Sequence, residues 1–195
     1  MPEYTIRALT GQTWDAFADL CERNNGGGMG GCWCCWFHNA TKAERVASGG
    51  GDWRGYKEGL VRAGRAHAAL VFDGDTAVGW CEYGSVGELP GVFHRKEIES
   101  DGAPLPDHRL TCFFVDRGHR RSGVARAALD GALGLIAADG GGVVETYPRD
   151  IPAGAKYSAS FLVNVTRGMF EDAGFTHVRT VGKNTCVMTK SVRPA

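Results

Sequence analysis

The residues with the clearest potential for chemistry lie in one run, Leu110-Thr-Cys-Phe-Phe-Val-Asp-Arg-Gly-His-Arg-Arg-Ser-Gly-Val-Ala125. An apolar segment leads into a loop that contains Arg117, Arg120 and Arg121, and a helix that starts with small residues is predicted from Gly123 onward. The first backbone N–H groups of a helix have no partner inside it, and the helix dipole makes that end positive. Because such an end binds phosphate oxygens, the run predicts a site for a phosphate-bearing ligand.

A second run, Cys32-Trp-Cys-Cys-Trp-Phe-His38, contains residue types that ligate metals. Cys32, Cys35 and His38 are spaced three apart, so they could share one helical face. A zinc site normally adds a second pair of ligands elsewhere in the chain, and the sequence offers no such pair. We therefore expect no metal, and we expect this run to pack on the core as an aromatic plug.

Composition limits the classes of partner. Lysine plus arginine and aspartate plus glutamate number 22 each. This balance argues against a general affinity for nucleic acid or an anionic membrane, since both depend on a basic surface. No apolar run is long enough to span a bilayer, and the N-terminus lacks the basic-then-apolar order of a secretory signal. We expect a cytoplasmic protein with neither nucleic acid nor membrane as partner.

Hydrophobic patterning predicts a sheet with helices packed on it. The segments 66–72 and 76–83 flank Asp73-Gly74, a pair that suits the tight turn of a β-hairpin. Thr13 is a candidate N-cap for the first helix. Further strands are expected at 4–9, 110–115, 143–147, 175–181 and 185–190, and helices at 14–21, in pieces over 42–64, at 123–139 and at 158–173. Residues 84–108 are expected to form a long loop, either a lid or a solvated surface excursion. This order of elements indicates the α/β (α+β) class, with a central mixed sheet of about six or seven strands flanked by helices.

Two motifs resemble those of the GNAT acyltransferase superfamily. Arg120-Arg121-Ser122-Gly123-Val124-Ala125 resembles its Arg/Gln-x-x-Gly-x-Gly/Ala signature, and it lies between a strand and a helix, as it does in that family. Met169-Phe-Glu-Asp-Ala-Gly-Phe175 resembles the Leu-Tyr-x-x-x-Gly-Phe ending of the family's next helix. The order of elements agrees over residues 66–190. The resemblance implies one GNAT domain over residues 1–195, with acetyl-CoA as co-substrate.

The resemblance also implies which residues hold the co-substrate. The backbone of the loop at 120–125 would bind the CoA pyrophosphate, and the preceding strand would pair with the pantetheine arm. Asn164 lies one place away from a helix asparagine that often contacts pantetheine. The implied cofactor-binding residues are Phe113, Phe114, Val115, Arg120, Arg121, Ser122, Gly123, Val124, Ala125, Asn164 and Phe170.

The implied reaction is direct transfer of an acetyl group from acetyl-CoA to the amine of a small molecule. The N–H of Val115 is the implied donor to the tetrahedral oxyanion. A base must also take a proton from the ammonium group. Glu82 and His108, which both lie at the ends of expected strands, are the leading candidates, and Asp107 and Glu145 are alternatives.

The main departure from the family pattern is Phe170, which stands where many members have a tyrosine that protonates the leaving thiolate. Phenylalanine cannot return a proton. Tyr147, Tyr157 or water would take this part, or the thiolate leaves unaided, because a thiol pKa of about 8.5 makes it a tolerable leaving group.

Several alternatives stay open at this point. Trp33, Trp36 and Phe37 could form the wall of an acceptor pocket instead of a plug, because GNAT substrates bind beside the first two helices. The acyl donor could be pantetheine on a carrier protein. A non-catalytic acyl-CoA-binding regulatory module is a third reading, which the missing tyrosine favours. A homodimer is left open as well.

Overall fold

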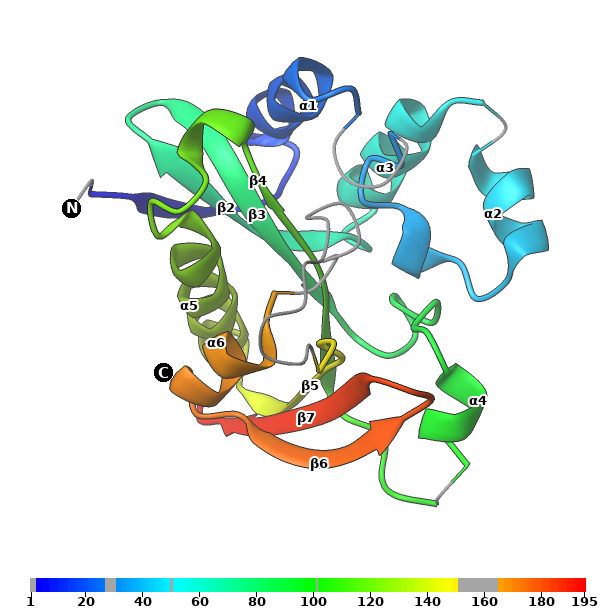
Figure 1. Ribbon diagram of the computed structural model, residues 1–195. Coiled ribbons are helices and arrows are strands. Elements are labelled where there is room, and N and C mark those ends of the chain that lie inside the picture. Colours follow the sequence, from blue (N-terminus) through cyan, green and yellow to red (C-terminus); the bar gives the residue numbers. More distant parts are fainter. Residues whose placement is uncertain (1–2, 27–30, 50, 101, 151–164) are drawn as a thin grey trace.

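The structure is a computed structural model that describes residues 3–26, 31–49, 51–100, 102–150 and 165–195. Its centre is a seven-stranded sheet with the order β1-β2-β3-β4-β5-β7-β6 (Figure 1). The strands are β1 (Thr5–Ala8), β2 (His67–Asp73), β3 (Thr76–Gly84), β4 (His108–Val115), β5 (Gly142–Thr146), β6 (Thr176–Val181) and β7 (Thr185–Val192). Strands β4 and β5 are parallel, and the other neighbouring pairs of this sheet are antiparallel. The expected mixed sheet is confirmed.

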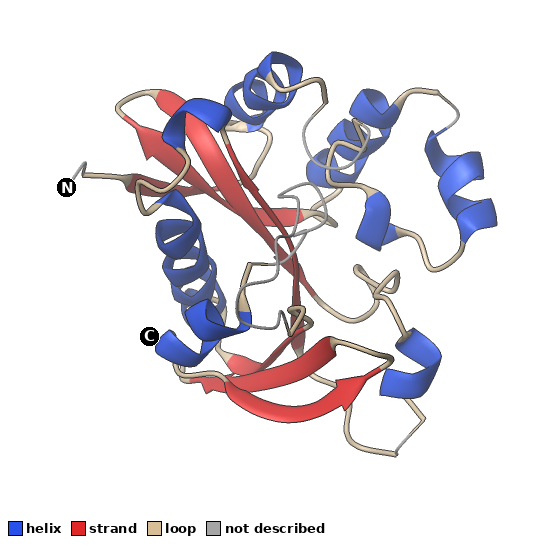
Figure 2. Cartoon of the chain, in the orientation of Figure 1, coloured by secondary structure: helices blue, strands red, loops and turns tan. Residues whose placement is uncertain are grey.

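Helices cover both faces of this sheet (Figure 2). They are α1 (Trp14–Arg23), α2 (Lys42–Gly49), α3 (Trp53–Arg62), α4 (Arg95–Ile98), α5 (Val124–Ala138) and α6 (Arg167–Asp172), with short 3-10 helices η1 (Trp36–His38) and η2 (Arg117–His119). Helices α1 and α3 pack with η1 on one side, which we call the α1/α3 face. Helices α5 and α6 pack on the opposite side, the α5 face. None of the helices in the described ranges is both long and apolar enough to cross a bilayer.

Most elements lie where the hydrophobic pattern predicts them. The hairpin of β2 and β3 turns at Gly74, whose φ of +59° favours glycine. Thr13 occupies the N-cap position of α1, as predicted, but its hydroxyl makes no cap bond and donates instead to the carbonyl of Ala8 at 2.7 Å. The long connection at 84–108 contains α4 and buries Leu89 and Ile98 in the core, so it is not a solvated excursion. Of the helix expected at 158–173, residues 158–164 lie outside the described ranges.

Strand β4 carries one residue more than its neighbour β3 can pair. Cys112 lies opposite Glu82 and Leu110 lies opposite Tyr83, so Thr111 has no partner position in β3. The core contacts agree, because Leu110 packs on the α5 face and Cys112 packs on the opposite one. Residues two apart in a regular strand share a face, so one extra residue must lie between them. Thr111 therefore forms a β-bulge, which bends the strand.

The bulge coincides with the end of pairing between β4 and β5. In the described part of the chain, this ladder consists of His108, Arg109 and Leu110 opposite Val144, Glu145 and Thr146. From Thr111 to Val115, β4 continues beside β3 alone. The two parallel strands therefore separate at the bulge, and one side of β4 is left without a strand partner among the described residues.

Phe170 lies in the core of the α5 face and is fully buried. Its ring meets Phe113 edge-on at 5.9 Å between centroids and Phe175 at 5.1 Å. The segment Met169–Phe175 thus supplies two of the three rings of this cluster. Phe170 is a packing residue of the core beneath β4.

We expect the Phe170→Ala variant to lose about 3–5 kcal/mol in the free energy of unfolding, because a large buried ring is removed. Urea denaturation followed by circular dichroism measures this quantity. Val178→Ala is the control, because Val178 lies in β6 with 48% of its surface exposed and should change stability by about 0.5 kcal/mol or less. Similar midpoints for both variants would contradict the packing described for Phe170.

Candidate functional site

The predicted phosphate site lies in the link between β4 and α5. Asp116 follows β4 and accepts the N–H of Gly118 at 2.9 Å, while Arg23 and Asn24 of the α1 region hold its other oxygen at 3.4 and 3.2 Å. Helix α5 then begins after Gly123, whose φ is +92° and which brings no side-chain cap. A Cβ added to Gly123 would meet no described atom within 4 Å. No described side chain therefore caps the first N–H groups of α5, which suits an approaching anion.

The side chains beside this helix start are positively charged. Arg117, Arg120 and Arg121 are exposed. Ser122 is engaged within the protein, because its hydroxyl accepts from Tyr4 at 2.9 Å and donates to the carbonyl of His119. Ser122 therefore has its backbone to offer a ligand, while the arginines supply charge. Guanidinium groups and backbone N–H groups together are suited to phosphate oxygens.

The backbone of β4 presents donors on the side that has left β5. The N–H of Asp116 donates to the carbonyl of Val78 in β3 at 2.8 Å. Backbone groups of successive residues in a strand point to alternate sides, so those of Phe114 also face β3. Those of Phe113 and Val115 must then face the opposite side, where β5 has separated. An extended ligand could pair with this edge as an added strand does.

A buried polar cluster lies where the two strands separate. The Tyr147 hydroxyl donates to Glu145 of β5. Arg109 of β4 stands opposite Glu145 in the register of the two strands, and its guanidinium lies 5.9 Å from the Tyr147 ring centroid. Arg109 is fully buried and donates to the Leu89 carbonyl and to Glu99, each at 3.0 Å. Burial raises the pKa of Tyr147 well above its usual value, and the carboxylate of Glu145 adds to this rise. Tyr147 is therefore a neutral hydroxyl donor at physiological pH.

Sequence reasoning singled out Tyr147 and weighed Glu145, but it missed Arg109. The available signal was a charged residue at the start of a strand that is otherwise densely apolar. Charged residues are almost never fully buried unless they are paired.

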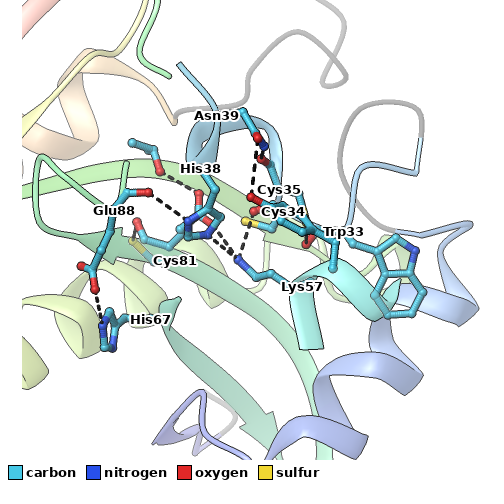
Figure 3. A network of polar contacts seen from close by, with 12 residues as sticks. Trp33, Cys34, Cys35, His38, Asn39, Lys57, His67, Cys81 and Glu88 are labelled. Carbon is cyan, nitrogen blue, oxygen red and sulfur yellow. Dashed lines mark hydrogen bonds and ion pairs between the residues drawn. The ribbon is translucent and has the colours of Figure 1, made fainter. Parts of the chain in front are cut away.

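Glu82 does not face an open cleft, as the sequence led us to expect, but is fully buried. Its Oε1 accepts from Lys57 of α3 at 2.8 Å and lies 3.2 Å from Nε2 of His38. Its Oε2 accepts from the hydroxyl of Thr111, the bulged residue of β4, at 2.8 Å. Lys57 also donates to the carbonyl of Cys34 at 3.0 Å (Figure 3). We call Glu82, Lys57, His38 and Thr111 the Glu82 network.

The contacts in the Glu82 network determine its protonation states. Burial alone would raise the pKa of Glu82, but the charge of Lys57 and the hydrogen bond that Lys57 donates lower it well below its usual value. Burial alone would lower the pKa of Lys57, but Glu82 raises it above its usual value. Burial and the neighbouring Lys57 lower the pKa of His38. At neutral pH, a charged pair therefore coexists with a neutral imidazole.

The tautomer of His38 follows from the same contacts (Figure 3). Nε2 lies 3.0 Å from Nζ of Lys57, an ammonium that can only donate, so Nε2 accepts. Nδ1 then carries the proton and donates to the carbonyl of Glu88 at 3.0 Å. A base of so depressed a pKa as Glu82, with both oxygens already bonded, is poorly suited to take a proton from an amine.

The aromatic residues of the cysteine run divide between core and surface. Trp33 stacks on Trp14 of α1 at 6.3 Å between centroids, and Phe37 is buried in the same core. Trp36 is partly exposed, and the guanidinium of Arg45 lies over its ring, 3.9 Å from the ring centroid. Trp33 and Phe37 therefore act as the expected plug, while Trp36 alone of the three can line a pocket.

The backbone of this run is not a continuous helix, because Trp33 and Cys34 have φ of +49° and +58°. Cys32, Cys35 and His38 therefore do not share a helical face, and His38 belongs to the Glu82 network. Burial raises the pKa of the Cys35 thiol to about 12, so it is a poor ligand and nucleophile at neutral pH. Among the described residues, no group of three or more potential ligands could hold a metal ion.

The remaining predicted residues lie elsewhere. His108 and His67, together with Tyr83 and Asp139, line a hollow of about 520 Å³ at the C-terminal end of α5. This end is opposite to the helix start that forms the phosphate site, so His108 is separated from the loop at 120–125 by the length of β4. Asn164 and Tyr157 lie outside the described residues.

Comparisons with known proteins agree with the fold. No protein-family model and no curated protein matches the sequence. Solved structures do match over nearly their whole length: an acetyltransferase of the GNAT family from Desulfovibrio desulfuricans has 16% identity and a TM-score of 0.53, with 97% of this chain and 99% of that chain covered. A Corynebacterium glutamicum structure described as histone acetyltransferase HPA2 and related acetyltransferase has 13% identity and a TM-score of 0.51, covering 98% and 97%. PaiA N-acetyltransferase from Thermoplasma acidophilum, in complex with coenzyme A, has 13% identity and a TM-score of 0.50, covering 97% and 99%. The chain therefore has the GNAT acetyltransferase fold.

The buried ion pair generates a test of stability. Lys57→Met leaves an ionised carboxylate without its partner, and we expect a loss of about 3–5 kcal/mol in the free energy of unfolding at pH 7. The double variant Lys57→Met/Glu82→Leu should regain most of this loss, because no uncompensated charge remains. Chemical denaturation of the wild type, both single variants and the double variant completes a double-mutant cycle, which gives the interaction free energy between Lys57 and Glu82.

The same variants test the pH dependence. The lowered pKa of Glu82 stabilises the wild type above the unfolded-state value of about 4.3, and this contribution is lost as the pH falls below it. The raised pKa of Lys57 stabilises the wild type below about 10.4, and this contribution is lost as the pH rises above it. The difference between wild type and Lys57→Met should thus be largest from about pH 5 to 10. A difference that stays constant from pH 3 to 8 would contradict the assigned charges.

Proposed function

We propose that this protein is an N-acyltransferase, one domain over residues 1–195, that transfers an acetyl group from acetyl-CoA to the amine of a small molecule. The observation that carries the proposal is the separation of β4 from β5 after three residue pairs. Within the described residues, it leaves backbone donors on one side of β4 without a strand partner, and the uncapped start of α5 with its arginines follows. The likeness in fold to GNAT acetyltransferases supports this reading.

The co-substrate has a natural path along these features. The pyrophosphate would lie at the N-terminus of α5, against the N–H groups from Gly123 to Ala125 and beside Arg120 and Arg121. The pantetheine arm would pair with the free edge of β4. Its thioester would then lie near the N–H groups of Phe113 and Val115. One of these N–H groups can donate to the tetrahedral oxyanion, with Val115 as the donor expected from the sequence.

Tyr147 and Glu145 are the pair that we propose for proton transfer. They lie at the junction where β4 and β5 separate, and Tyr147 is a neutral hydroxyl. Glu145 would receive a proton from the attacking ammonium, directly or through the hydroxyl. Tyr147 would then donate its proton to the thiolate that leaves when the tetrahedral adduct collapses, and Glu145 would reprotonate it. The net reaction releases the thiol, the amide and one proton.

This assignment moves the proton chemistry away from Glu82 and His108. Both oxygens of Glu82 are bonded within its network, and His108 lines the hollow at the other end of β4. Phe170 is buried in the core and has no proton to offer. Trp36, the partly exposed aromatic residue on the α1/α3 face, is our candidate for the acceptor pocket.

The first test of this proposal concerns the co-substrate. Acetyl-CoA should bind with an affinity on the order of micromolar and raise the melting temperature of the wild type. Gly123→Glu should abolish this shift, because it places a negative side chain in the phosphate site. Gly134→Glu is the matched control, since it adds the same charge to an exposed position of the same helix away from its start. A full shift in Gly123→Glu would show that CoA binds elsewhere.

The second test concerns the proton donor. Tyr147→Phe should lower turnover about 10²-fold or more, because general acid–base catalysis is lost, while the affinity for acetyl-CoA stays within about twofold. Steady-state release of free thiol with a panel of amines measures turnover, and calorimetry measures binding. His108→Asn is the comparison, and we expect its turnover to stay near that of the wild type. The reverse pattern would move the proton chemistry to the start of β4.

A further inference from the structure

The carboxylate of Glu82 connects a charged cluster to the bulge in β4. On one side it accepts a hydrogen bond from Lys57 at 2.8 Å, and Nε2 of His38 lies 3.2 Å away. On the other side it accepts the hydroxyl of Thr111 at 2.8 Å. Glu82, Lys57 and the Thr111 side chain lie in the interior, so water cannot substitute for these partners. The hydrogen bond from the Thr111 side chain therefore ends on a fixed acceptor.

The position of a bulge decides which backbone groups face which neighbour. The extra residue at Thr111 puts Leu110 and Phe113 on the α5 face. It also puts the N–H groups of Phe113 and Val115 on the side that has left β5, because backbone groups alternate along the strand. If the extra residue moved beyond Val115, these N–H groups would turn toward β3 instead. Something must therefore specify which residue is the extra one.

Apolar packing alone does not make this choice, because the residues after Thr111 are all apolar or small (Cys112, Phe113, Phe114 and Val115). Thr111 alone in this stretch carries a hydroxyl. A buried carboxylate that lacked this donor would lose a hydrogen bond that it cannot replace. Because the second oxygen of Glu82 needs a hydrogen-bond donor, Thr111 is favoured as the extra residue of β4.

Lys57 keeps Glu82 in place. All three of its N–H donors are used, on Glu82, His38 and the carbonyl of Cys34 (Figure 3). Glu82 cannot turn away without leaving an ammonium unpaired in the interior, which is costly. A buried ion pair seldom stabilises a fold more than apolar residues of the same size would, so its best-attested use is to specify one arrangement.

We propose that Glu82 is a positioning residue that fixes the bulge at Thr111 and thereby aims the N–H groups of Phe113 and Val115 at the thioester. This role rests on the proposed function for its effect on turnover, while the geometry of the bulge can be tested without any ligand. Because Lys57 also holds Cys34 and His38, the same network ties the loop that carries Trp36 to β4. The acceptor side and the acyl side of the site are thus joined through one carboxylate.

Thr111→Val and Thr111→Ser form a matched pair for the test. Valine has the shape of threonine without its hydroxyl, while serine keeps the hydroxyl. In ¹H–¹⁵N spectra of the free protein, Thr111→Val should shift the amide signals of Phe113 and Val115 well beyond those of exposed β6 residues, and Thr111→Ser should restore them. Turnover should fall at least about tenfold in Thr111→Val at a temperature where it is fully folded, a factor that corresponds to about 1.4 kcal/mol. Thr111→Ser should recover it to within about threefold.

Each outcome has a separate meaning. If Thr111→Val folds with unshifted amide signals and wild-type turnover, the positioning role is wrong. Glu82→Gln separates positioning from catalysis: a positioning residue leaves the pH–rate profile in place at lower turnover, whereas loss of a limb of that profile would make Glu82 the base and overturn the proposal. Failure of the wild type to bind acetyl-CoA would defeat the proposed function, and the amide shifts of Thr111→Val would still decide whether the hydroxyl sets the bulge.

Discussion

The rest of the structure depends on a single constraint on β4. This strand must stay paired with β3 along one side while it separates from β5 along the other side. A complete parallel ladder would use every backbone donor of the strand and leave none for a ligand. The extra residue at Thr111 resolves the conflict, because it bends β4 after three pairs with β5 while the ladder with β3 continues. Helix α5 follows β4 in the chain after the link at 116–123, so the strand edge and the helix start belong to one strand–loop–helix unit.

Two buried carboxylates on the α1/α3 face have different surroundings, and we propose different roles for them. Glu82 has an ammonium at 2.8 Å and a hydroxyl on its other oxygen, so it stays ionised and fixed. Glu145 has the hydroxyl of Tyr147 as its partner and lies where the strands separate. In our proposal, environment, and not residue type, assigns one carboxylate to positioning and the other to proton transfer. The sequence shows two glutamates on apolar strands and cannot tell them apart.

Local patterns predicted the parts of the fold that depend on local chemistry. The Asp-Gly turn, the glycine before α5 and the helical spacing after it act within a few residues, and the structure confirms these elements. The Glu82 network joins residues from η1, α3, β3 and β4, so no window along the chain contains it. Lys57 resembled a solvated helix residue in a polar segment, and Arg109 had no obvious partner. The left-handed residues of the cysteine run could not be foreseen either, because tryptophan and cysteine have no preference for that conformation.

Residue-resolved hydrogen exchange with and without acetyl-CoA tests the central claim most directly. The claim is that the edge of β4 released by the bulge binds the pantetheine arm while the start of α5 binds the pyrophosphate. Saturating acetyl-CoA should slow exchange at Phe113, Val115 and the amides from Gly123 to Ala125, and should leave the hollow around His67 and His108 unchanged. Slower exchange at that hollow, with no change along β4, would contradict the account.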